Sequence, residues 1–496
     1  MTPELPRGLF LDNETVPVGG RATFKVIDPA DGSTVATVAS GTAEDARAAM
    51  DSAARAQPKW ERIGAEARGK ILRRAADRLA SRGEELARLV TREMGKVLYE
   101  ARAEVTGAVD NLAFYPSFAR TLSGEEVAGL PHGETMRLLW IARGVVVGIT
   151  PWNFPAATVT RKIAPALLAG NTMVLKPSSN TPLSSLLIAE VLRDAGLPPG
   201  VLNVVPGSGG ALGGALVGHP ACSTVTLTGS TAVGVEVARE AAPGMAKCLL
   251  ELGGKAPVLV AEDADLDWAA RATVWARFWN AGQACIAAEK CYVHESVAPR
   301  FLEKVAALTA ALRVGPGLSP GVDMGPLYAP GARDSVAKAV AGATGAGARA
   351  LVGGSAVTDG PLARGAFYRP TILDRVTDDL PIAREEIFGP VLPVLTFARW
   401  DEAIEAANRN QYGLSSYVFT RDLHRAETAA RDLKFGETYI NRVGPESPQG
   451  YHAGMRHSGL AGEGTAWGVR DYLQLKTVYV DWKEPHEADY FLPYPD

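Results

Sequence analysis

A thiol, a carboxylate and an amide stand in sequence settings that suit catalysis, and the thiol of Cys285 is the first of them. It follows residues 280–284, Asn-Ala-Gly-Gln-Ala, a turn-rich segment without apolar periodicity. A thiol in such a place can be exposed, and neighbouring backbone N–H dipoles can lower its pKa, which makes it a nucleophile. We expect the other cysteines to be buried, unreactive thiols, the usual state of free cysteine. These are Cys222, Cys248 and Cys291, which border or begin β-rich runs.

The carboxylate is Glu251, which ends the apolar run of residues 248–250 and precedes Leu252-Gly253-Gly254. Ligands of open α/β sheets bind beyond the carboxyl ends of the strands. A partly buried carboxylate in that position has a raised pKa and can serve as a general base. A strand-end salt bridge is the alternative role for this side chain.

The amide is Asn153, in the segment Pro151-Trp152-Asn153-Phe154-Pro155 that follows an apolar run. The two prolines stiffen this loop and hold the amide between two aromatic side chains. An amide held in this way can donate a hydrogen bond to an oxyanion. Simple packing of the loop is the alternative.

Two glycine-rich turns follow predicted strands and suggest a nucleotide. Residues 202–205 run into Pro-Gly-Ser-Gly-Gly at 206–210, and residues 225–228 run into Gly229-Ser230-Thr231. Glycines between a strand and a helix N-terminus let backbone N–H groups approach a phosphate, whose charge the helix dipole favours. A tight connection needs glycine in any case, and neither turn matches the usual dinucleotide or phosphate-loop fingerprint. A dinucleotide would therefore bind in an unusual Rossmann variant.

The elements that must position these residues form two successive sets in which strands alternate with helices. Such alternation favours two α/β units, each with a parallel sheet covered on both faces. The expected strands are residues 145–149, 173–175, 202–205 and 225–228 in the first set, and residues 258–260, 291–294 and 417–420 in the second.

Helix signals are clearest in the N-terminal hundred residues, which we expect to be mostly helical. Thr42 and Asp45 mark the start of an Ala-rich helix that Pro58 ends, and the apolar spacing from Ile71 to Leu79 marks a second helix. Further helices are expected between the N-cap Thr181-Pro182 and the stop signal Gly196, and after Asp265, Ser296 and Trp400.

Two segments, residues 136–142 and 475–480, alternate in polarity like exposed strands and lie outside both α/β units. Open strand edges invite pairing. We therefore expect these segments to pair with each other or with another subunit.

The composition excludes several classes of protein. The chain of 496 residues is long enough for two or three domains, and its net charge of −4 gives no field for gathering nucleic acid. The longest apolar runs fall short of the roughly 20 residues that span a bilayer, and residues 1–10 lack a leader pattern. We therefore expect a soluble, cytoplasmic protein without a membrane partner. The 4 cysteines lack the spacing of a zinc site, so no metal is expected.

Six motifs occur in order along the chain: residues 151–155, Lys176-Pro177 with Thr181-Pro182, Thr228-Gly229-Ser230, residues 251–255 with Pro257, Gly282-Gln283-x-Cys285, and residues 386–390. Together they resemble the aldehyde dehydrogenase superfamily over about residues 10–482. The tract from residues 435–442 through 449–454 looks most like the bacterial lactaldehyde and glycolaldehyde dehydrogenase branch of that superfamily. Any one motif is weak, but the ordered set is very specific. The resemblance implies the aldehyde dehydrogenase fold, an α/β architecture with a Rossmann-like cofactor domain, an α/β catalytic domain and a small β oligomerisation arm.

The same resemblance implies domains that are not consecutive blocks, and a homodimer or homotetramer assembled through the arm. The tail at residues 483–496 either folds over a neighbouring subunit's entrance or is loosely held. The implied NAD(P)-binding domain comprises residues 1–123 and 144–253, the catalytic domain residues 254–440, and the arm with its tail residues 124–143 and 470–496.

The resemblance also implies a mechanism for Cys285, Asn153 and Glu251. Cys285 attacks a small-molecule aldehyde, and the Asn153 amide and the Cys285 backbone N–H hold the thiohemiacetal oxyanion. Hydride passes to NAD or NADP, and Glu251 activates the water that hydrolyses the thioester to a carboxylic acid. A CoA-acylating enzyme or a non-phosphorylating glyceraldehyde-phosphate dehydrogenase of the same fold is the alternative, and Glu251 favours water over CoA.

Two readings from other classes of protein have less support. A non-catalytic protein of this fold would have lost Cys285 or Glu251. A cofactor-independent cysteine hydrolase would need a histidine partner, and none of the 7 histidines lies in a recognisable pairing motif.

The family pattern places the cofactor and marks one departure from it. Lys176 corresponds to a contact of the adenosine ribose, and many NAD-preferring members have Glu three residues later, where this chain has Ser179. Serine removes a charge that would repel a 2′-phosphate, so NADP is tolerated or preferred; binding of NAD through Lys176 is the alternative. The implied cofactor residues are Thr150, Trp152, Lys176, Ser179, Gly207, Gly229, Ser230, Gly234, Leu252, Glu386 and Phe388.

The implied substrate pocket contains Phe154, Arg161, Ile286 and His452. Arg161 and His452 stand at positions that are often aromatic in the family. Two polar groups in the wall favour a small hydroxylated or anionic aldehyde. Ile286, which follows the nucleophile, is more apolar than the residue typical of the lactaldehyde branch.

Overall fold

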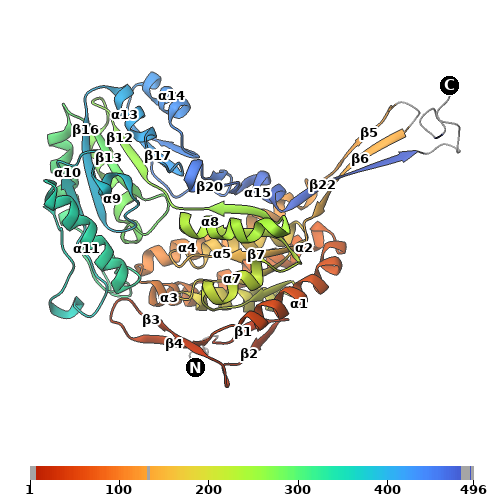
Figure 1. The fold of residues 1–496 in the computed structure, drawn as a ribbon. Helices are drawn as coiled ribbons and strands as arrows, with labels where there is room; N and C mark the ends of the chain where they lie inside the picture. Colours follow the sequence, from red (N-terminus) through yellow and green to blue (C-terminus); the bar gives the residue numbers. More distant parts are fainter. Residues whose placement is uncertain (1–6, 131–133, 482–491, 493–496) are drawn as a thin grey trace.

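Two large, mostly parallel sheets carry the fold (Figure 1). The computed structural model describes residues 7–130, 134–481 and 492. Within them, the sheets contain every strand expected for the two α/β units. The expected tail at residues 483–496 lies outside the described residues apart from residue 492.

The first sheet has eight strands in the order β2-β1-β9-β8-β7-β10-β11-β20. Its five central strands are parallel, and both edges are antiparallel. The central strands are β9 (Leu202–Val204), β8 (Thr172–Lys176), β7 (Val145–Ile149), β10 (Cys222–Thr228) and β11 (Lys247–Glu251), and the edge strands are β1 (Leu9–Leu11), β2 (Glu14–Val16) and β20 (Gly459–Leu460).

Helices bury both faces of the first sheet because its strands are apolar on both sides. On β7, Val146 packs into the cluster that contains α2, α4, α5 and α6, while Val145 and Val147 pack into the opposite cluster with α1, α7 and α8. Runs of consecutive apolar residues are typical of such doubly covered strands. The helices are α1 (Ala43–Arg62), α2 (Ala65–Ser81), α3 (Gly83–Met94), α4 (Leu98–Phe114), α5 (Ala157–Leu168), α6 (Pro182–Asp194), α7 (Gly209–Val217) and α8 (Thr231–Ala241).

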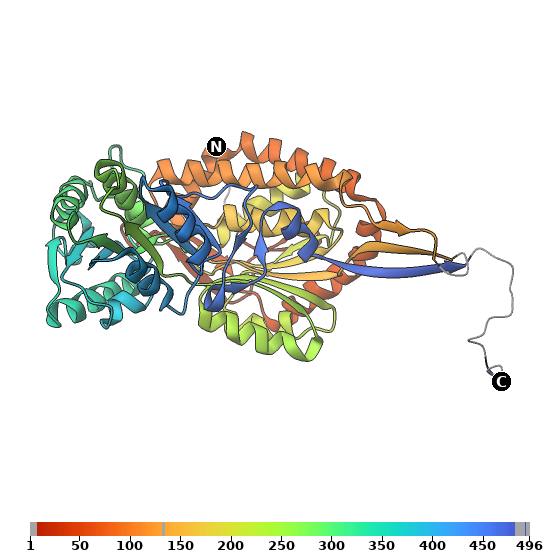
Figure 2. The same cartoon turned by 90° about the horizontal axis from the view of Figure 1, so that it is seen from above.

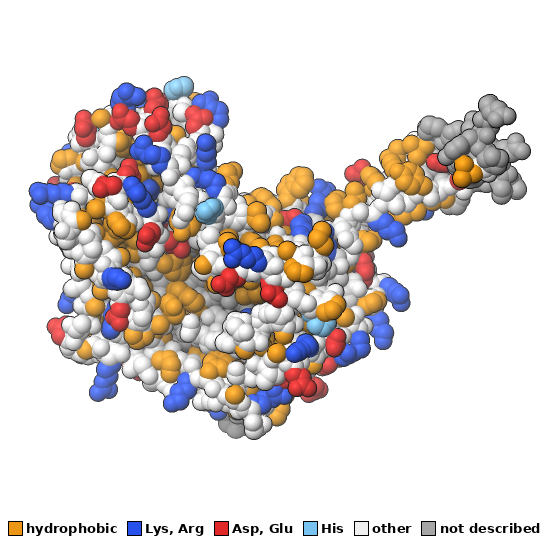
Figure 3. Space-filling model, viewed as in Figure 1, with side chains coloured by type: hydrophobic (Ala, Val, Ile, Leu, Met, Phe, Trp, Pro, Cys, Tyr) orange, Lys and Arg blue, Asp and Glu red, His pale blue; other side chains and the backbone are white. Residues whose placement is uncertain are grey.

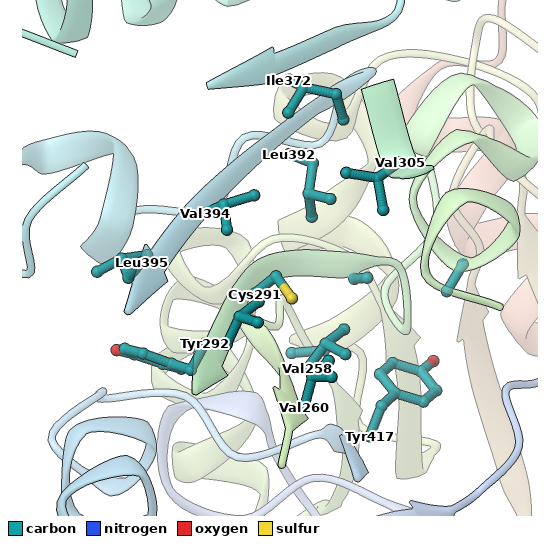
Figure 4. Close-up of a cluster of buried hydrophobic side chains, with 14 of the residues drawn as sticks. Val258, Val260, Cys291, Tyr292, Val305, Ile372, Leu392, Val394, Leu395 and Tyr417 are labelled. Atoms are coloured by element: carbon teal, nitrogen blue, oxygen red, sulfur yellow. The ribbon is translucent and has the colours of Figure 1, made fainter. Parts of the chain in front are cut away.

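The second sheet has seven strands in the order β14-β15-β16-β13-β12-β17-β18, all parallel except for β14. Figure 4 shows Val258 and Cys291 among its buried apolar side chains. The strands are β12 (Ala256–Val260), β13 (Ala288–His294), β14 (Arg349–Val352), β15 (Thr371–Asp374), β16 (Val391–Phe397), β17 (Ser415–Phe419) and β18 (Glu437–Ile440), and the helices are α9 (Leu266–Phe278), α10 (Ala298–Ala310), α11 (Pro330–Gly345), α12 (Pro381–Arg384), α13 (Trp400–Asn408) and α14 (Leu423–Asp432).

A three-stranded antiparallel arm projects from the rest of the molecule (Figures 1 and 2). It consists of β5 (Glu125–Val127), β6 (Glu134–Ala142) and β22 (Leu473–Asp481), and β6 pairs with β22 along all nine residues. The prediction that the two segments pair with each other is confirmed. The domain boundaries and the homodimer or homotetramer stay predictions.

Three details of the N-terminal half differ from expectation. Pro58 does not end α1, which continues to Arg62 and buries Trp60, whose indole N–H donates to Leu167 O at 3.0 Å. The N-terminal hundred residues also contain strands, since β1 and β2 are followed by the hairpin β3 (Thr23–Ile27) and β4 (Thr34–Ala39). Short strands that are half exposed give little periodicity, which is why the sequence did not reveal them.

The predicted cap of α6 is the third difference. Thr181 stands at the N-cap, but its side chain makes no capping hydrogen bond. The buried carboxylate of Glu93 accepts from the backbone N–H groups of Leu183 and Ser184 instead, each at 3.0 Å. At Thr42, by contrast, the side chain and Asp45 form the expected capping box.

No helix in the described part of the chain is long and apolar enough to cross a membrane. The same residues contain no cluster of His, Cys, Asp or Glu side chains that could hold a metal ion.

Candidate active site

A cleft of about 480 Å³ brings together side chains from both sheets. Figure 3 shows that this face of the molecule is hollowed between the part built on the second sheet, at the upper left, and the part built on the first sheet. The cleft is lined by the three predicted catalytic residues, Cys285, Glu251 and Asn153, and by all four predicted pocket residues. These residues come from segments that lie far apart in the sequence, so only the fold assembles them.

Cys285 lies on a rigid loop between α9 and β13. Asn280 and Ala281 adopt left-handed backbone conformations, with φ of 51° and 54°. Gly282 also has a positive φ, and a Cβ there would lie 2.4 Å from the Gly389 carbonyl oxygen, so glycine is required. The Gln283 side chain ties the loop down by donating to Asn280 O and accepting from Tyr328 N. The turn-rich segment therefore fixes the thiol at the cleft wall.

The electrostatics of the thiol differ from the prediction. Burial raises the pKa of Cys285, and the carboxylates of Glu446 and Glu251 act in the same direction, while a hydrogen bond with His452 lowers the pKa. The expected lowering by backbone dipoles is wrong, because desolvation disfavours the thiolate more strongly. Burial likewise raises the pKa of the thiols of Cys222, Cys248 and Cys291.

His452 is the histidine partner that sequence motifs did not reveal. It is 3% exposed, and its Nδ1 lies 3.0 Å from Glu437 Oε1. Although burial alone would lower it, the carboxylates of Glu437 and Glu251 hold the pKa of His452 well above its usual value. Despite its burial, the imidazole therefore favours its charged form. Glu437 precedes His452 by 15 residues on a different strand, so no local motif marks the pair.

Asn153 lies beside the nucleophile loop. Its Nδ2 donates to Gln283 O at 3.1 Å, and Asn280 Nδ2 donates to Asn153 O at 3.2 Å. The side chain is 5% exposed, and its Oδ1 has no partner in the described part of the structure. The loop that carries the amide is thus held against the loop that carries the thiol.

Glu251 ends β11 at the carboxyl edge of the first sheet, as predicted, and is 6% exposed. Thr228 Oγ1 donates to Glu251 Oε2 at 3.0 Å. The other oxygen, Oε1, is buried and accepts no hydrogen bond from the described residues. One oxygen is therefore anchored while the other is available to take a proton.

The remaining wall of the cleft holds charges of both signs. Arg161 donates to Glu446 in a short ion pair, and its Nε lies 3.9 Å from Glu463 Oε2. Burial would raise the pKa of Glu446, but the charges of Arg161 and His452 hold it at about 2. The sequence prediction included Arg161 but missed both acids. Glu446 follows Gly444-Pro445 in an irregular loop, where no periodic signal could have pointed to it.

Two further pocket residues form the apolar part of the wall. The centroids of the Phe154 and Trp279 rings lie 4.9 Å apart, and Lys96 Nζ lies 3.7 Å from the Phe154 centroid. Ile286 is buried, and its carbonyl oxygen accepts a hydrogen bond from the Tyr417 hydroxyl.

The predicted cofactor residues fall into two groups. Those that line the cleft are Trp152, Gly229, Ser230, Leu252, Glu386 and Phe388. The others, Thr150, Lys176, Ser179, Gly207 and Gly234, lie at the carboxyl ends of β7, β8 and β9 or, for Gly234, on α8 against Leu252.

Hydrogen bonds connect members of the second group at the carboxyl ends of the strands of the first sheet. Thr150 N donates to Lys176 O at 3.2 Å, and Ser179 Oγ donates to Gly207 O at 2.9 Å. The buried ammonium of Lys176 contacts only the carbonyl of Pro177, at 3.2 Å, among the described residues, and burial lowers its pKa. A buried cation without a carboxylate suits a hydroxylated or anionic ligand.

Glu386 and Phe388 are held by a buried charge cluster. The carboxylate of Glu289 accepts from Ile387 N at 2.8 Å and from Phe388 N at 3.2 Å, and it also pairs with Lys255 and Arg277. Phe388 has a φ of 50°, a conformation that costs energy for a bulky residue. The Glu289 cluster therefore fixes the segment in the form that presents Glu386 to the cleft.

The residues present fit a dinucleotide. Ser208 and Ser230 cap the N-termini of α7 and α8, which begin at the carboxyl ends of β9 and β10, where helix dipoles favour phosphate. Glu386 accepts from Gly254 N at 2.7 Å, and burial raises its pKa to about 7. A carboxyl group in this position can bond ribose hydroxyls. An NAD or NADP molecule would thus meet donors for its phosphates and acceptors for its sugars.

Comparison with known proteins agrees with this geometry. The model of the aldehyde dehydrogenase family matches residues 17–478. The chain is 41% identical over 475 residues to D-glyceraldehyde dehydrogenase (NADP(+)) of Picrophilus torridus, covering 96% of each protein. The crystal structure of lactaldehyde dehydrogenase from Escherichia coli, 40% identical, superposes with a TM-score of 0.93 and covers 96% of this chain and 99% of that one.

A third similar structure contains a cofactor. PnpE of Pseudomonas sp. WBC-3, in complex with nicotinamide adenine dinucleotide, is 34% identical with a TM-score of 0.95, and the match covers 98% of this chain and 100% of that chain. The predicted fold class and the predicted use of NAD or NADP are confirmed. By its sequence, its fold and the residues of its cleft, the chain belongs to the aldehyde dehydrogenase family.

Proposed function

We propose that the protein oxidises a small, uncharged aldehyde that carries a hydroxyl group, with NAD or NADP as the oxidant. The aldehyde, one water and the oxidised cofactor give the carboxylate, the reduced cofactor and two protons. The observation that carries the substrate class is the ion pair of Arg161 with Glu446, which leaves the cleft polar but without a surplus positive charge.

The catalytic steps follow from the placement of the three side chains. Cys285 loses its proton to solvent and its sulfur adds to the aldehyde carbon, while the Asn153 amide turns from Gln283 O toward the new oxyanion. When bound, NAD or NADP would supply the oxidation as the hydride acceptor. Glu251 then takes a proton from water through its free Oε1, and the water attacks the thioester and releases the thiol.

His452 helps to form the nucleophile. As a buried cation next to the thiol, it stabilises the thiolate that the carboxylates around it disfavour. Glu437 in turn keeps the imidazole charged and fixes its orientation through Nδ1.

The charge balance of the wall supports an uncharged substrate. Arg161 faces Glu446 and Glu463, and His452 faces Glu437, so each cation already has an acidic partner. An anionic aldehyde would have to displace one of these pairs. A hydroxyl group can share their donors and acceptors without breaking them.

Ser179 supports acceptance of NADP. Its hydroxyl is neutral and donates to Gly207 O, so position 179 carries no negative charge that would repel a 2′-phosphate. The similarity to an enzyme named for NADP(+) is in keeping with this proposal. Assays with NAD and with NADP measure which cofactor the enzyme prefers.

We further infer a cytoplasmic homodimer or homotetramer. All four cysteines are unpaired, as in a reducing compartment. The arm exposes Leu139, Leu475 and Tyr479, and such apolar side chains on a projecting sheet favour association with another subunit.

A panel of aldehydes, assayed with NAD and with NADP and with product identification, tests the proposal. Glycolaldehyde, lactaldehyde and glyceraldehyde should have higher kcat/KM than hexanal and than succinate semialdehyde. A higher kcat/KM for succinate semialdehyde would show that the enzyme prefers an anionic aldehyde. Formation of an acyl-CoA in the presence of CoA would favour the acylating alternative, against which the free Oε1 of Glu251 argues.

A further inference from the structure

A second cavity, of about 460 Å³, opens beside the second sheet and shares no lining residue with the active-site cleft. Lys290 of β13 forms part of its wall. The rest comes from Asp378, from Arg384 and Glu385 at the end of α12, and from the C-terminal end of α13 with Arg409 and Asn410. Three cationic and two acidic side chains thus surround one space.

Lys290 is a largely buried cation that forms no salt bridge among the described residues, and Asp378 acts on it only through its charge. It is 3% exposed, and in the described part of the chain no carboxylate or hydrogen-bond acceptor lies within bonding distance of its Nζ. Its recorded contact is with the face of the Tyr292 ring, 5.1 Å from the centroid. Burial lowers the pKa of Lys290 to about 8. Burying an ammonium group in this way is costly unless an acceptor compensates it.

Asn410 supplies a second donor that lacks an acceptor. It is 9% exposed, and its Oδ1 accepts from Tyr412 N at 2.8 Å, which fixes the orientation of the amide. The Nδ2 group is buried and has no partner among the described residues. Buried polar groups are nearly always hydrogen-bonded, so this N–H₂ group calls for an acceptor.

The acidic residues of the cavity do not fill that role. Asp378 accepts from the Tyr292 hydroxyl at 2.5 Å, and its other oxygen lies 3.6 Å from Arg409. Arg384 Nε donates to the backbone oxygen of Asp378 at 2.7 Å. Glu385 is exposed at the rim. The unsatisfied groups of the cavity are therefore donors and cations.

We propose that this cavity is a binding site for a small oxyanion, a phosphate or a carboxylate, held by Lys290 and Asn410 with Arg384 and Arg409 at the mouth. Hydrogen bonds to such an anion would satisfy the buried N–H₂ group of Asn410 and give the ammonium of Lys290 a charged acceptor. The proposal does not depend on the aldehyde that the enzyme oxidises.

The site lies next to the segment that presents Glu386. Arg384 ends α12 two residues before Glu386. Glu289, which precedes Lys290 on β13, holds the N–H groups of Ile387 and Phe388. Neighbouring residues of a strand point to opposite faces, so β13 separates the oxyanion site from the cofactor segment.

Titration calorimetry on the full chain saturated with NAD tests the site, because the cofactor then occupies the phosphate-binding groups of the first sheet. Inorganic phosphate and malonate serve as the probes, and binding of either one at one anion per chain supports the proposal. Tighter binding of phosphate would indicate a site for a tetrahedral oxyanion. Tighter binding of malonate would indicate a site for a carboxylate. Failure of both probes to bind would overturn it.

Two variants localise the binding. Lys290→Met removes the cation with little change in volume, and Asn410→Asp replaces the free donor by a charge that repels anions. Each should weaken the binding about tenfold or more, while Lys338→Met, at an exposed position on α11, should leave it unchanged. Equal affinity in all three variants would mean that an adventitious ion binds elsewhere.

Competitive acylation of lysines, read by mass spectrometry, gives a measurement that needs no variant. Bound anion should protect Lys290 and leave Lys338 as reactive as before. Unchanged reactivity of Lys290 at saturating anion would contradict the proposal even if calorimetry detects binding.

Discussion

Arg161 and Glu446, which are separated by 285 residues in the sequence, form an ion pair inside the active-site cleft. The pair is only partly exposed, so solvent screens it weakly. It turns a residue that would otherwise attract anions into part of a neutral hydrogen-bonding wall.

Replacement of Glu446 by Gln should shift the substrate preference toward anionic aldehydes. The charge of Arg161 then lacks its main partner and can bind a carboxylate. We expect the ratio of kcat/KM for succinate semialdehyde to that for glycolaldehyde to rise about tenfold. Glu446→Asp, which keeps the charge, is the matched control. An unchanged ratio in Glu446→Gln would show that the ion pair does not set specificity.

Replacement of Cys285 by Ser should abolish turnover and leave cofactor binding intact. A serine hydroxyl is far less acidic than a thiol and is not activated by the imidazolium of His452. We expect kcat to fall by about a thousandfold or more, while the NAD(P) dissociation constant, measured by fluorescence quenching, stays within about twofold. Turnover near the native level would contradict the role of the thiol.

Replacement of Glu251 by Gln should separate hydride transfer from hydrolysis. The amide cannot take a proton from water, so the thioester accumulates. A pre-steady-state burst of NAD(P)H should remain, while the steady rate falls by about 10²- to 10⁴-fold. Thr228→Val, which loses only the hydrogen bond to Oε2, serves as the control and should have a much smaller effect. A steady rate equal to the native one would exclude Glu251 as the base.

Ser179→Glu should discriminate against NADP. The new carboxylate would lie near the adenosine ribose, where it repels a 2′-phosphate and can bond the hydroxyls of NAD. We expect the KM for NADP to rise about tenfold or more relative to that for NAD. Ser179→Gln has a similar size without the charge and should change the ratio less. Equal effects of both variants would point to steric rather than electrostatic selection.

The buried carboxyl of Glu386 should make stability depend on pH. Its pKa is raised by burial to about 7 in the folded protein, against 4.5 as its ordinary value. The folded state therefore prefers the protonated acid, and this stabilisation, complete below about pH 4.5, is lost as the pH rises toward 7. We compare the free energy of unfolding of Glu386→Gln with that of the native chain. We expect the difference in favour of the variant to increase by about 1–3 kcal/mol from pH 5 to pH 8.

Urea unfolding of the cofactor-free protein at both pH values provides this measurement. Glu385→Gln, a change at the exposed neighbouring position, should show no such difference between the two pH values. If Glu385→Gln showed the same dependence on pH as Glu386→Gln, the effect would come from surface charge and not from the buried carboxyl group.

The sequence by itself determined the features that depend on neighbours in the chain. Runs such as residues 145–149 became buried strands because consecutive apolar residues suit a sheet covered on both faces. Thr42 and Asp45 capped α1 because both groups lie within one turn. Cys285, Glu251 and Asn153 could be selected as candidate catalytic residues because turns and strand ends place them at the carboxyl edge of a sheet, in agreement with the ordered motifs of the family.

Only the tertiary structure decided which charges face one another. No motif within a single segment of the chain predicts three of these pairs. They are Glu446 with Arg161, Glu437 with His452, and His452 with Cys285. The pKa of Cys285 proved to be raised because burial depends on what covers the thiol. Desolvation and Coulomb energies depend on distances in space, and side chains such as Arg161 and Glu446 come into contact only when the two sheets are assembled.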